Sequence, residues 1–246
     1  MKQAIVFIII SLGFLIIPQS QNAQTVHVRY KKFIVPGNTD YGRWVSSPEA
    51  KRKVREREEQ MANNVSEFYD LYSDGKISYF EYDTTITLTE LKDNRTWWSK
   101  MGEVKLSYAK DIRAGEVTIR SNILPDSLCH GFNYKQKYEW VAGEGMKVFA
   151  DLECQKLQYI DEEGNKTIVW YSPSIPISDG PQDFGGAPGL ILAVEAPNFN
   201  YIAEEVQVDD FPIEVQPVDL DFCLDEKEFR KQARVAMTQK YFNQQD

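Results

Sequence analysis

The sequence contains few residues of the types that bind transition metals or act as nucleophiles. Of its 246 residues, two are histidines, His27 and His130, and three are cysteines, Cys129, Cys154 and Cys223. These residues form no CxxC pair and no Cys/His cluster, so we expect no metal site. The sequence also has neither the GxxxxGK[ST] pattern of a phosphate-binding loop nor the GxSxG pattern of a serine hydrolase. We therefore expect no cofactor, and the residues favour a protein that is not an enzyme.

Basic residues are also scarce relative to acidic ones. The chain has 28 Lys and Arg residues against 37 Asp and Glu residues, which gives a formal net charge of −9 at pH 7. Binding to phosphate backbones requires clustered Lys and Arg, so this balance argues against nucleic acid and anionic membrane surfaces as partners. With 42% hydrophobic residues, the chain is too apolar to be a disordered tail.

The N-terminus carries an apolar run with the layout of a secretion signal. Lys2 precedes the run from Ala4 to Ile17, which a polar break and the small residue Ala23 follow. This order is typical of a signal peptide, and the run is short for a membrane-spanning helix. We predict a signal peptide over residues 1–23, with an uncleaved anchor as the alternative, and one β-rich domain over 24–246. The mature protein is then periplasmic or secreted and has no transmembrane segment.

The three cysteines allow one disulfide and one free thiol in an oxidising compartment. Cys154 lies inside an alternating run typical of a strand, where a buried free cysteine is common. A disulfide is therefore expected between Cys129 and Cys223. Cys129 and His130 are adjacent and would point to opposite faces of a strand, so they are not expected to act together as nucleophile and base.

Short alternating or β-branched runs, separated by turn residues, predict an antiparallel β-sheet. Asp74-Gly75 lies between two aromatic, alternating runs, which is a strong hairpin signal. The spacing of the further runs is typical of a long antiparallel meander. These predicted strands cover residues 25–35, 84–91, 104–109, 116–120, 134–141, 147–158, 166–172, 190–194 and 201–208.

Two helices are predicted to accompany the sheet. Ser47 has the residue type of a helix N-cap, and Pro48 and Glu49 suit the first turn. The charged run over residues 51–57 interleaves glutamates with Lys and Arg, which favours a solvated surface helix over an interaction patch. Asp225 is the expected N-cap of a C-terminal helix. The expected fold class is mainly β (α+β): a curved antiparallel sheet or half-barrel with an N-terminal surface helix and a C-terminal helix.

The stretch GPQDFGGAPGLILAVE, residues 180–195, concentrates glycines and prolines before an apolar run. Gly185, Gly186 and Gly189 could adopt positive φ, and a row of backbone N–H groups could bind an anion. The other residues of a phosphate loop are missing, and LILAVE reads as a buried strand and not as the helix of a dinucleotide site. We interpret the stretch chiefly as a corner that leads into a strand, with a ligand loop as the alternative.

Three acidic residues flank this stretch: Asp179, Asp183 and Glu195. Two carboxylates that face each other across a cleft can hydrolyse glycosidic bonds. Nearness in sequence does not establish such a pair, and acidic residues are common in turns. An envelope glycan hydrolase is therefore the alternative to a binding protein, and a structural subunit of a surface complex is a third hypothesis.

Aromatic residues recur through the C-terminal half of the chain. A curved sheet could bury them as a core, or it could present them to an apolar ligand or a protein segment. The candidate binding residues are Trp140, Trp170, Tyr171, Phe184, Gly186, Pro188 and Gly189.

Two stretches resemble the GLPGLI family of secreted Bacteroidetes proteins: YEWVAGEGMKVFADLECQKLQY and IVWYSPSIPISDGPQDFGGAPGLILAVE. The motif after which that family is named appears here as GAPGLI, residues 186–191. Ala187 replaces the usual leucine, a departure that could loosen one apolar contact. The resemblance is strongest over residues 134–206.

The resemblance implies an envelope location and supplies no catalytic residues, because the family has no established biochemical activity. The strand pattern is also similar to the half-barrel of periplasmic lipoprotein carriers, a likeness of architecture alone. We therefore expect a non-enzymatic module, periplasmic or outer-membrane-associated. Its expected partners are an apolar ligand or an envelope protein.

Overall fold

The computed structural model describes residues 25–36, 47–64, 67–83, 105–209 and 220–242. The predicted signal peptide and the predicted strand 84–91 lie outside these residues, as does residue 104. Among the described residues, neither helix combines the length and the apolar character that crossing a membrane requires.

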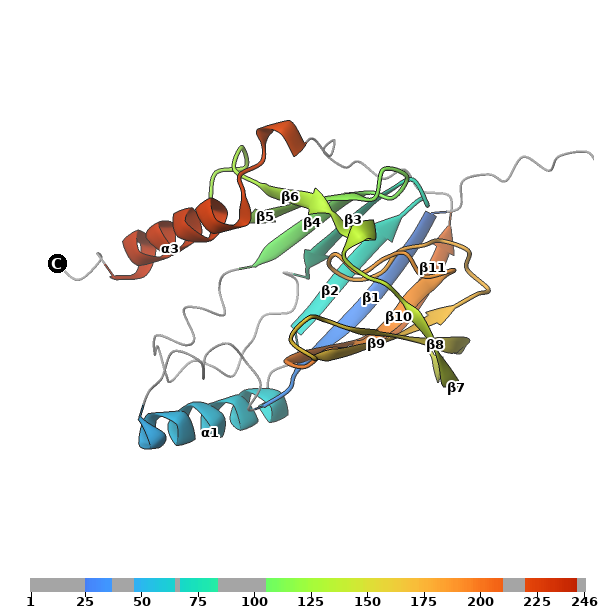
Figure 1. Ribbon diagram of the computed structural model, residues 1–246, viewed down its shortest axis with the longest axis horizontal. Coiled ribbons are helices and arrows are strands. Elements are labelled where there is room, and N and C mark those ends of the chain that lie inside the picture. Colours follow the sequence, from blue (N-terminus) through green and yellow to red (C-terminus); the bar gives the residue numbers. More distant parts are fainter. Residues whose placement is uncertain (1–24, 37–46, 65–66, 84–104, 210–219, 243–246) are drawn as a thin grey trace, which may run out of the picture.

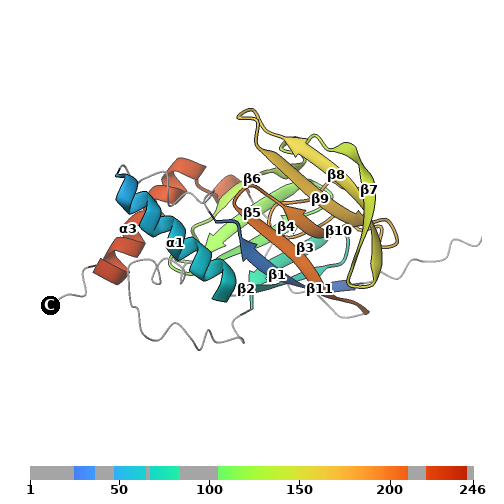
Figure 2. The same cartoon turned by 90° about the horizontal axis from the view of Figure 1, so that it is seen from below.

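Eleven antiparallel strands form one open sheet (Figure 1), which confirms the predicted mainly β class. The spatial order is β6-β5-β4-β3-β2-β1-β11-β10-β9-β8-β7. Figures 1 and 2 show that the sheet bends strongly, so that β7, β8 and β9 run across the direction of β1 and β2. The strands are β1 (Thr25–Ile34), β2 (Glu67–Ser73), β3 (Ile77–Tyr82), β4 (Leu106–Asp111), β5 (Glu116–Ser121), β6 (His130–Asn133), β7 (Val141–Phe149), β8 (Leu152–Ile160), β9 (Lys166–Ser172), β10 (Leu190–Glu195) and β11 (Phe199–Asp209).

Alternating residues place the core on one face of the central strands. Val26, Val28 and Tyr30 of β1 are at most 1% exposed, and the polar residues between them are half-buried. Successive side chains of a strand point to opposite faces of the sheet, so the alternation of apolar and polar residues in the sequence decides which face is buried in the core. The middle of this core is a group of rings whose centroids lie 5.2–6.4 Å apart: Tyr30, Tyr69, Phe80, Tyr108 and Tyr201.

The hairpin predicted at Asp74-Gly75 joins β2 to β3 and is confirmed. Asp74 Oδ1 accepts hydrogen bonds from the backbone N–H of Lys76 (2.7 Å) and of Ile77 (2.8 Å). Gly75 has φ +76°, which a residue without a side chain adopts at no steric cost. The local residues alone therefore specify this turn.

Two predicted strands differ from the structure. Residues 147–158 were expected to form one strand, but they belong to β7 and β8, and the chain reverses at Ala150 (φ +46°) and Asp151 (φ +62°). Two-residue hairpins need positive φ, and no glycine announces it here. Residues 134–141 were also expected to be a strand. They begin with the 3₁₀ turn η2 (Tyr134–Gln136), and β7 starts only at Val141.

Helix α1 (Pro48–Asn64) is the predicted surface helix. The Ser47 hydroxyl accepts the backbone N–H of Ala50 (3.1 Å), which confirms the expected cap. Its charges pair along the helix, as in Arg52–Glu56 (3.0 Å). Such exposed pairs support the helix by a few tenths of a kcal/mol each, about 0.2–0.5. The charged run is therefore a solvated face.

Helix α3 (Glu226–Phe242) closes the described chain. The carboxylate of Asp225 accepts the backbone N–H of Glu228 (2.9 Å), so the predicted cap is confirmed. Phe229 is 7% exposed, and its ring lies 6.0 Å from the ring of His130 on β6. The helix thus rests on the β6 end of the sheet, as Figure 1 shows.

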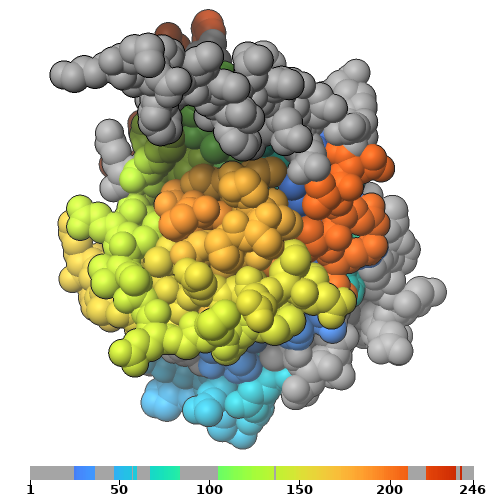
Figure 3. All heavy atoms as spheres, turned by 90° about the vertical axis from the view of Figure 1, so that its right-hand side faces the viewer, coloured from blue at the N-terminus to red at the C-terminus, as the bar shows by residue number. Residues whose placement is uncertain are grey.

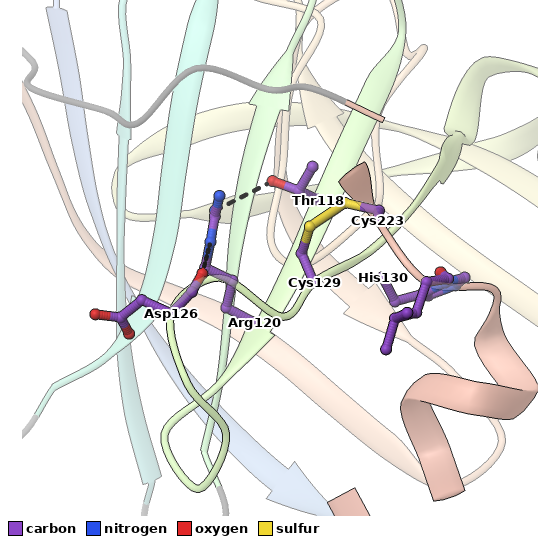
Figure 4. Close-up of a disulfide and its surroundings, with 7 residues drawn as sticks. Thr118, Arg120, Asp126, Cys129, His130 and Cys223 are labelled. Atoms are coloured by element: carbon purple, nitrogen blue, oxygen red, sulfur yellow. Dashed lines mark hydrogen bonds between the residues drawn. A yellow bond between two sulfur atoms is a disulfide. The ribbon is translucent and has the colours of Figure 1, made fainter. Parts of the chain in front are cut away.

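A disulfide joins Cys129 to Cys223, the pair that the sequence favoured (Figure 4). It fastens the short 3₁₀ turn η3 (Leu220–Phe222) and the start of α3 to the β6 edge. The bridge closes a separation of 94 residues, for which chain entropy predicts a stabilisation of about 4–5 kcal/mol. Cys154 is free and buried, and burial raises the pKa of its thiol to about 11.

Candidate functional site

The glycine segment, defined here as residues 179–189, connects β9 to β10 and lies largely inside the protein. Eight of its eleven residues are buried, Gln182 is half-buried, and only Gly186 and Pro188 are exposed. Its start is fixed on the next strand, because Ile191 N donates to Asp179 O (2.8 Å). In the space-filling view of Figure 3, light orange atoms from this part of the chain lie between the green and yellow strands and orange-red β11. The segment is therefore a corner, as predicted, and also part of the packed interior.

Lys110 of β4 holds the glycine segment from across the core. Its ammonium group forms an ion pair with Asp179, and both side chains are 0% exposed. The same group donates to Gly180 O (2.6 Å) and to Phe184 O (3.4 Å). Three acceptors satisfy the three N–H groups of an ammonium, so the buried cation is fully used by the segment. A strand some seventy positions earlier thus fixes the segment.

Close approach, and not a left-handed backbone, explains the glycine at position 189. The expectation of positive φ there is wrong, and the same correction applies to Gly185. A Cβ on Gly189 would lie 2.2 Å from Ser172 O, and one on Gly185 would lie 2.6 Å from Cε2 of Tyr134. Gly186 does adopt positive φ (+80°). Two different physical requirements therefore operate within one run of glycines.

The Trp140 cluster, defined as Tyr138, Trp140, Tyr159 and Phe184, is built on the glycine segment. The rings of Tyr138 and Trp140 stack at 5.0 Å, and Phe184 stacks on the other side at 5.2 Å from Tyr138. Tyr159 of β8 meets Tyr138 edge-on at 5.4 Å. The indole N–H of Trp140 donates to Gly185 O (2.8 Å). Tyr138, Trp140 and Tyr159 are half-buried, so this rigid stack reaches the surface.

The structure brings only some of the predicted binding residues together. Trp140, Phe184 and Gly186 are neighbours: a Cβ on Gly186 would lie 3.7 Å from Nε1 of Trp140. Trp170 and Tyr171 are adjacent on β9 and are both buried, at 5% and 7% exposure. Adjacent strand residues face opposite sides, so they cannot share one site. Pro188 is exposed and Gly189 is buried.

Each of the three candidate carboxylates is engaged by a neighbour. Asp183 pairs with Lys137 (2.5 Å) and accepts the hydroxyl of Tyr138 (3.0 Å). Glu195 pairs with Lys147 (2.8 Å) and accepts the indole N–H of Trp170 (2.9 Å). Burial would raise the pKa of Glu195, but these hydrogen bonds and the Lys147 charge outweigh it and lower the pKa. A lowered pKa suits a structural anion better than a general acid.

Sequence reasoning missed the cations that hold these anions. Lys110 follows Leu106 and Tyr108 at every second position of β4, and this alternation places it on the buried face. Lysine is rarely fully buried unless it is paired, so its position was itself a signal for a buried acidic partner. Lys137 lies in the 134–141 region that was expected to be a strand, and no comparable pattern marks it.

A further carboxylate, the half-buried Glu67, lies between two lysines at the start of β2. Lys32 Nζ is 3.0 Å and Lys105 Nζ is 2.7 Å from its oxygens, and Tyr69 donates its hydroxyl at 3.1 Å. Burial alone would raise the pKa of Glu67, but the two ammonium groups outweigh burial and lower the pKa to about 2. The Lys105 ammonium also lies 3.9 Å from the ring centroid of Tyr82.

Glu67→Gln is expected to lower the free energy of unfolding by about 3 kcal/mol at pH 7, since the pKa falls from 4.5 to about 2 on folding. This stabilisation is present above pH 4.5 and is lost as the pH falls towards 2. Urea unfolding at pH 7, 4 and 2 would measure it, with the exposed Glu153→Gln as control. Equal effects of Glu67→Gln at pH 7 and pH 2 would contradict this origin.

The part of the chain that builds this site also matches a known protein family. Residues 132–193 match the model of a family described as "Protein of unknown function (Porph_ging)". This match covers a quarter of the chain and includes the glycine segment, the Trp140 cluster and β7 to β9. No curated protein matches the sequence.

Two solved structures of PNGF-II, in space groups C2 and P21, share the fold. They superpose with TM-scores of 0.53 and 0.52 at 11% and 12% sequence identity, and 87% of this chain is covered in each. The chain spans about a third of the length of those chains, 33% and 34%. At this identity the likeness concerns the fold alone.

Proposed function

We propose that the protein is a non-enzymatic binding module of the cell envelope, and that the Trp140 cluster is its contact surface for a protein partner. The observation that carries this proposal is the stack of Phe184, Tyr138 and Trp140, which is fixed from below by the glycine segment and reaches the surface. Rigid aromatic side chains lose little conformational entropy on binding and dominate the energy of many interfaces.

The surroundings of the cluster favour a protein partner over a small apolar ligand. Val141 follows Trp140 directly and is 60% exposed, and Gly186 and Pro188 are exposed as well. Small-molecule sites bury most of the ligand in a concave pocket, whereas protein interfaces use aromatic anchors on an accessible surface. An apolar ligand on the same cluster is the alternative that the experiment below distinguishes.

A role in binding without catalysis is supported by how the acidic groups are used. Asp179, Asp183 and Glu195 each pair with a lysine, so none is held ready as an acid or base. Within the part of the chain that the structure describes, no group of three or more His, Cys, Asp or Glu side chains could hold a metal ion. A glycan hydrolase would need two carboxylates free to face the substrate.

An envelope location is supported by the disulfide between Cys129 and Cys223, because disulfides persist in oxidising compartments. The resemblance of residues 134–206 to the GLPGLI family of secreted proteins supports the same proposal. Fractionation of the native cells, with the protein detected in the periplasm or outer membrane, tests it directly.

A photo-crosslinking amino acid at Val141 is expected to capture one partner protein in native cells, and the same probe at Lys53 of α1 is not. Trp140→Ala should reduce the Val141 adduct at least fivefold, since it removes the outer ring of the stack. Trp140→Phe keeps an aromatic ring and should retain most of the Val141 adduct. Mass spectrometry of the adduct identifies the partner.

Fold integrity must be checked for each variant by its thermal unfolding. A folded Trp140→Ala protein that gives the wild-type adduct would contradict the role of the cluster. If no protein adduct forms and native mass spectrometry finds a bound apolar molecule that Trp140→Ala loses, the ligand alternative holds.

A further inference from the structure

The two edge strands of the sheet differ: β6 is covered by other parts of the chain, and β7 has no described strand on its outer side. At the β6 edge, Leu224 forms a parallel bridge with His130, and Leu224 N donates to Cys129 O (2.7 Å). The disulfide between Cys129 and Cys223 fastens this cover, and α3 lies against β6. At the other edge, β7 pairs with β8 on one side, and no described strand pairs with its other side.

β7 exposes apolar side chains together with this open edge. Met146 and Val148 are each 63% exposed, Val141 is 60% exposed, and Ile160 on the neighbouring strand is 59% exposed. Exposed apolar edge strands invite pairing with another chain, and proteins normally protect them. An open edge with this composition therefore requires an explanation.

The usual protections are weak over the second half of β7. The strand contains no proline, and its one lysine, Lys147, is paired with Glu195 (2.8 Å). The irregularity between Ala142 and Met146 disturbs only the first half of the ladder. Residues Met146–Phe149 pair in register with β8 up to the two-residue turn. In such a hairpin the closing pair, Phe149 and Leu152, is a hydrogen-bonded pair. Hydrogen-bonded and non-hydrogen-bonded pairs alternate along the ladder, so the backbone N–H and C=O groups of Val148 and Met146 point to the open side.

Acidic residues outnumber basic ones on and beside β7, where the cations are Lys147, which is paired with Glu195, and Lys156, whose side chain lies against Gly143. Four exposed acidic residues lie beside or on the strand, and none of them forms an ion pair with a described residue: Glu139, Glu144, Asp151 and Glu153. The whole chain carries a net charge of −9. Like charges therefore oppose pairing between two copies of β7, and they attract a strand that carries Lys or Arg.

We propose that β7 binds a partner protein by strand addition, and that the partner supplies an extended segment with apolar and Lys or Arg residues at alternate positions. This inference deepens the proposed function, on which it rests for the existence of a partner. Backbone hydrogen bonds to Met146 and Val148 would supply affinity, and the alternating side chains would supply specificity. Val141 continues the same surface towards the Trp140 cluster.

The test uses the full mature chain and a synthetic nonapeptide of alternating lysine and valine. A nonapeptide of alternating glutamate and valine is the control, and a lysine–valine peptide with a central proline is a second one. Titration calorimetry measures affinity, and hydrogen exchange locates the site. We expect binding of the lysine–valine peptide with protection of the Met146 and Val148 amides, and at least tenfold weaker binding of both controls.

Variants separate the backbone contact from side-chain and charge effects. Val148→Pro removes a backbone N–H that points to the open side. It should weaken peptide binding about tenfold, which corresponds to the loss of about one hydrogen bond. Val148→Thr keeps that N–H and should change affinity less than threefold. Glu144→Lys combined with Glu153→Lys should weaken binding and reduce its salt dependence. Circular dichroism and thermal unfolding establish that each variant is folded.

Three results would overturn the inference: no binding at millimolar peptide, protection outside β7, or equal binding of the proline-containing peptide. Self-association that Val148→Pro abolishes would make a second copy the occupant and would also overturn it. The proposed function is judged separately. If the Val141 adduct in cells persists in Val148→Pro and is lost in Trp140→Ala, the binding role stands and strand addition does not.

Discussion

Replacing Gly189 by valine is expected to prevent folding or to cost at least about 3 kcal/mol. The reason is contact with backbone atoms that cannot move aside. A Cβ at this position would lie 2.2 Å from Ser172 O, 2.9 Å from Ser172 C and 3.2 Å from Ile175 O. Ser172 is paired with Leu190 in the β9–β10 ladder, and Leu190 N donates to Ile175 O (3.0 Å). The clash therefore opens the ladder that the core depends on.

Matched glycine variants separate this clash from backbone strain. Gly189→Ala has the same Cβ and should be nearly as damaging as the valine variant. Gly164→Ala places a Cβ in open space at φ +82°, so it should cost only about 1 kcal/mol. Urea unfolding of the three proteins makes the comparison. A Gly189→Ala protein with the stability of Gly164→Ala would contradict close approach as the reason for the glycine.

The features that the sequence predicted correctly are those that neighbouring residues determine. The Ser47 and Asp225 caps and the turn at Asp74-Gly75 each depend on a side chain and backbone groups within three residues. Alternation likewise identified most strands, because burial on one face imposes a period of two. Such signals do not depend on how the strands are finally arranged.

The errors have two origins, a turn whose residue types do not announce it and a contact with a distant part of the chain. The reversal at Ala150 and Asp151 uses positive φ without glycine, so only the pairing of β7 with β8 reveals it. Gly189 was correctly singled out, but its reason lies in the backbone of Ser172 on the adjacent strand.

In the candidate site, too, the sequence predicted some features correctly and missed those that depend on distant residues. Trp140 and Phe184 were named as binding residues and belong to one stack, in which each contacts Tyr138, because the glycine segment turns back on the residues before β7. Trp170 and Tyr171 were named with them, although strand alternation already implied that they face opposite sides. The partners Tyr138 and Tyr159 could not be assigned from spacing alone, since only the β8 register brings Tyr159 to Tyr138.

Lys110→Met is expected to destabilise the protein by about 3–5 kcal/mol, because it leaves the Asp179 carboxylate buried without a cation. The ammonium also binds Gly180 O and Phe184 O, so the glycine segment loses its attachment to β4. Lys147→Met is the matched control: its ion pair with Glu195 is partly exposed and should contribute less than about 1 kcal/mol. Urea unfolding at pH 7 measures both.

Variants of Asp179, the other residue of this ion pair, make the prediction more specific. Asp179→Asn removes the buried anion but leaves the ammonium of Lys110 with its two carbonyl acceptors, so it should cost less than Lys110→Met. Combining Lys110→Met with Asp179→Asn removes both charges and should recover at least half of the single loss, since the unpaired anion is gone. A double variant that is as unstable as the sum of the two single variants would show that the ion pair is not what holds the glycine segment on β4.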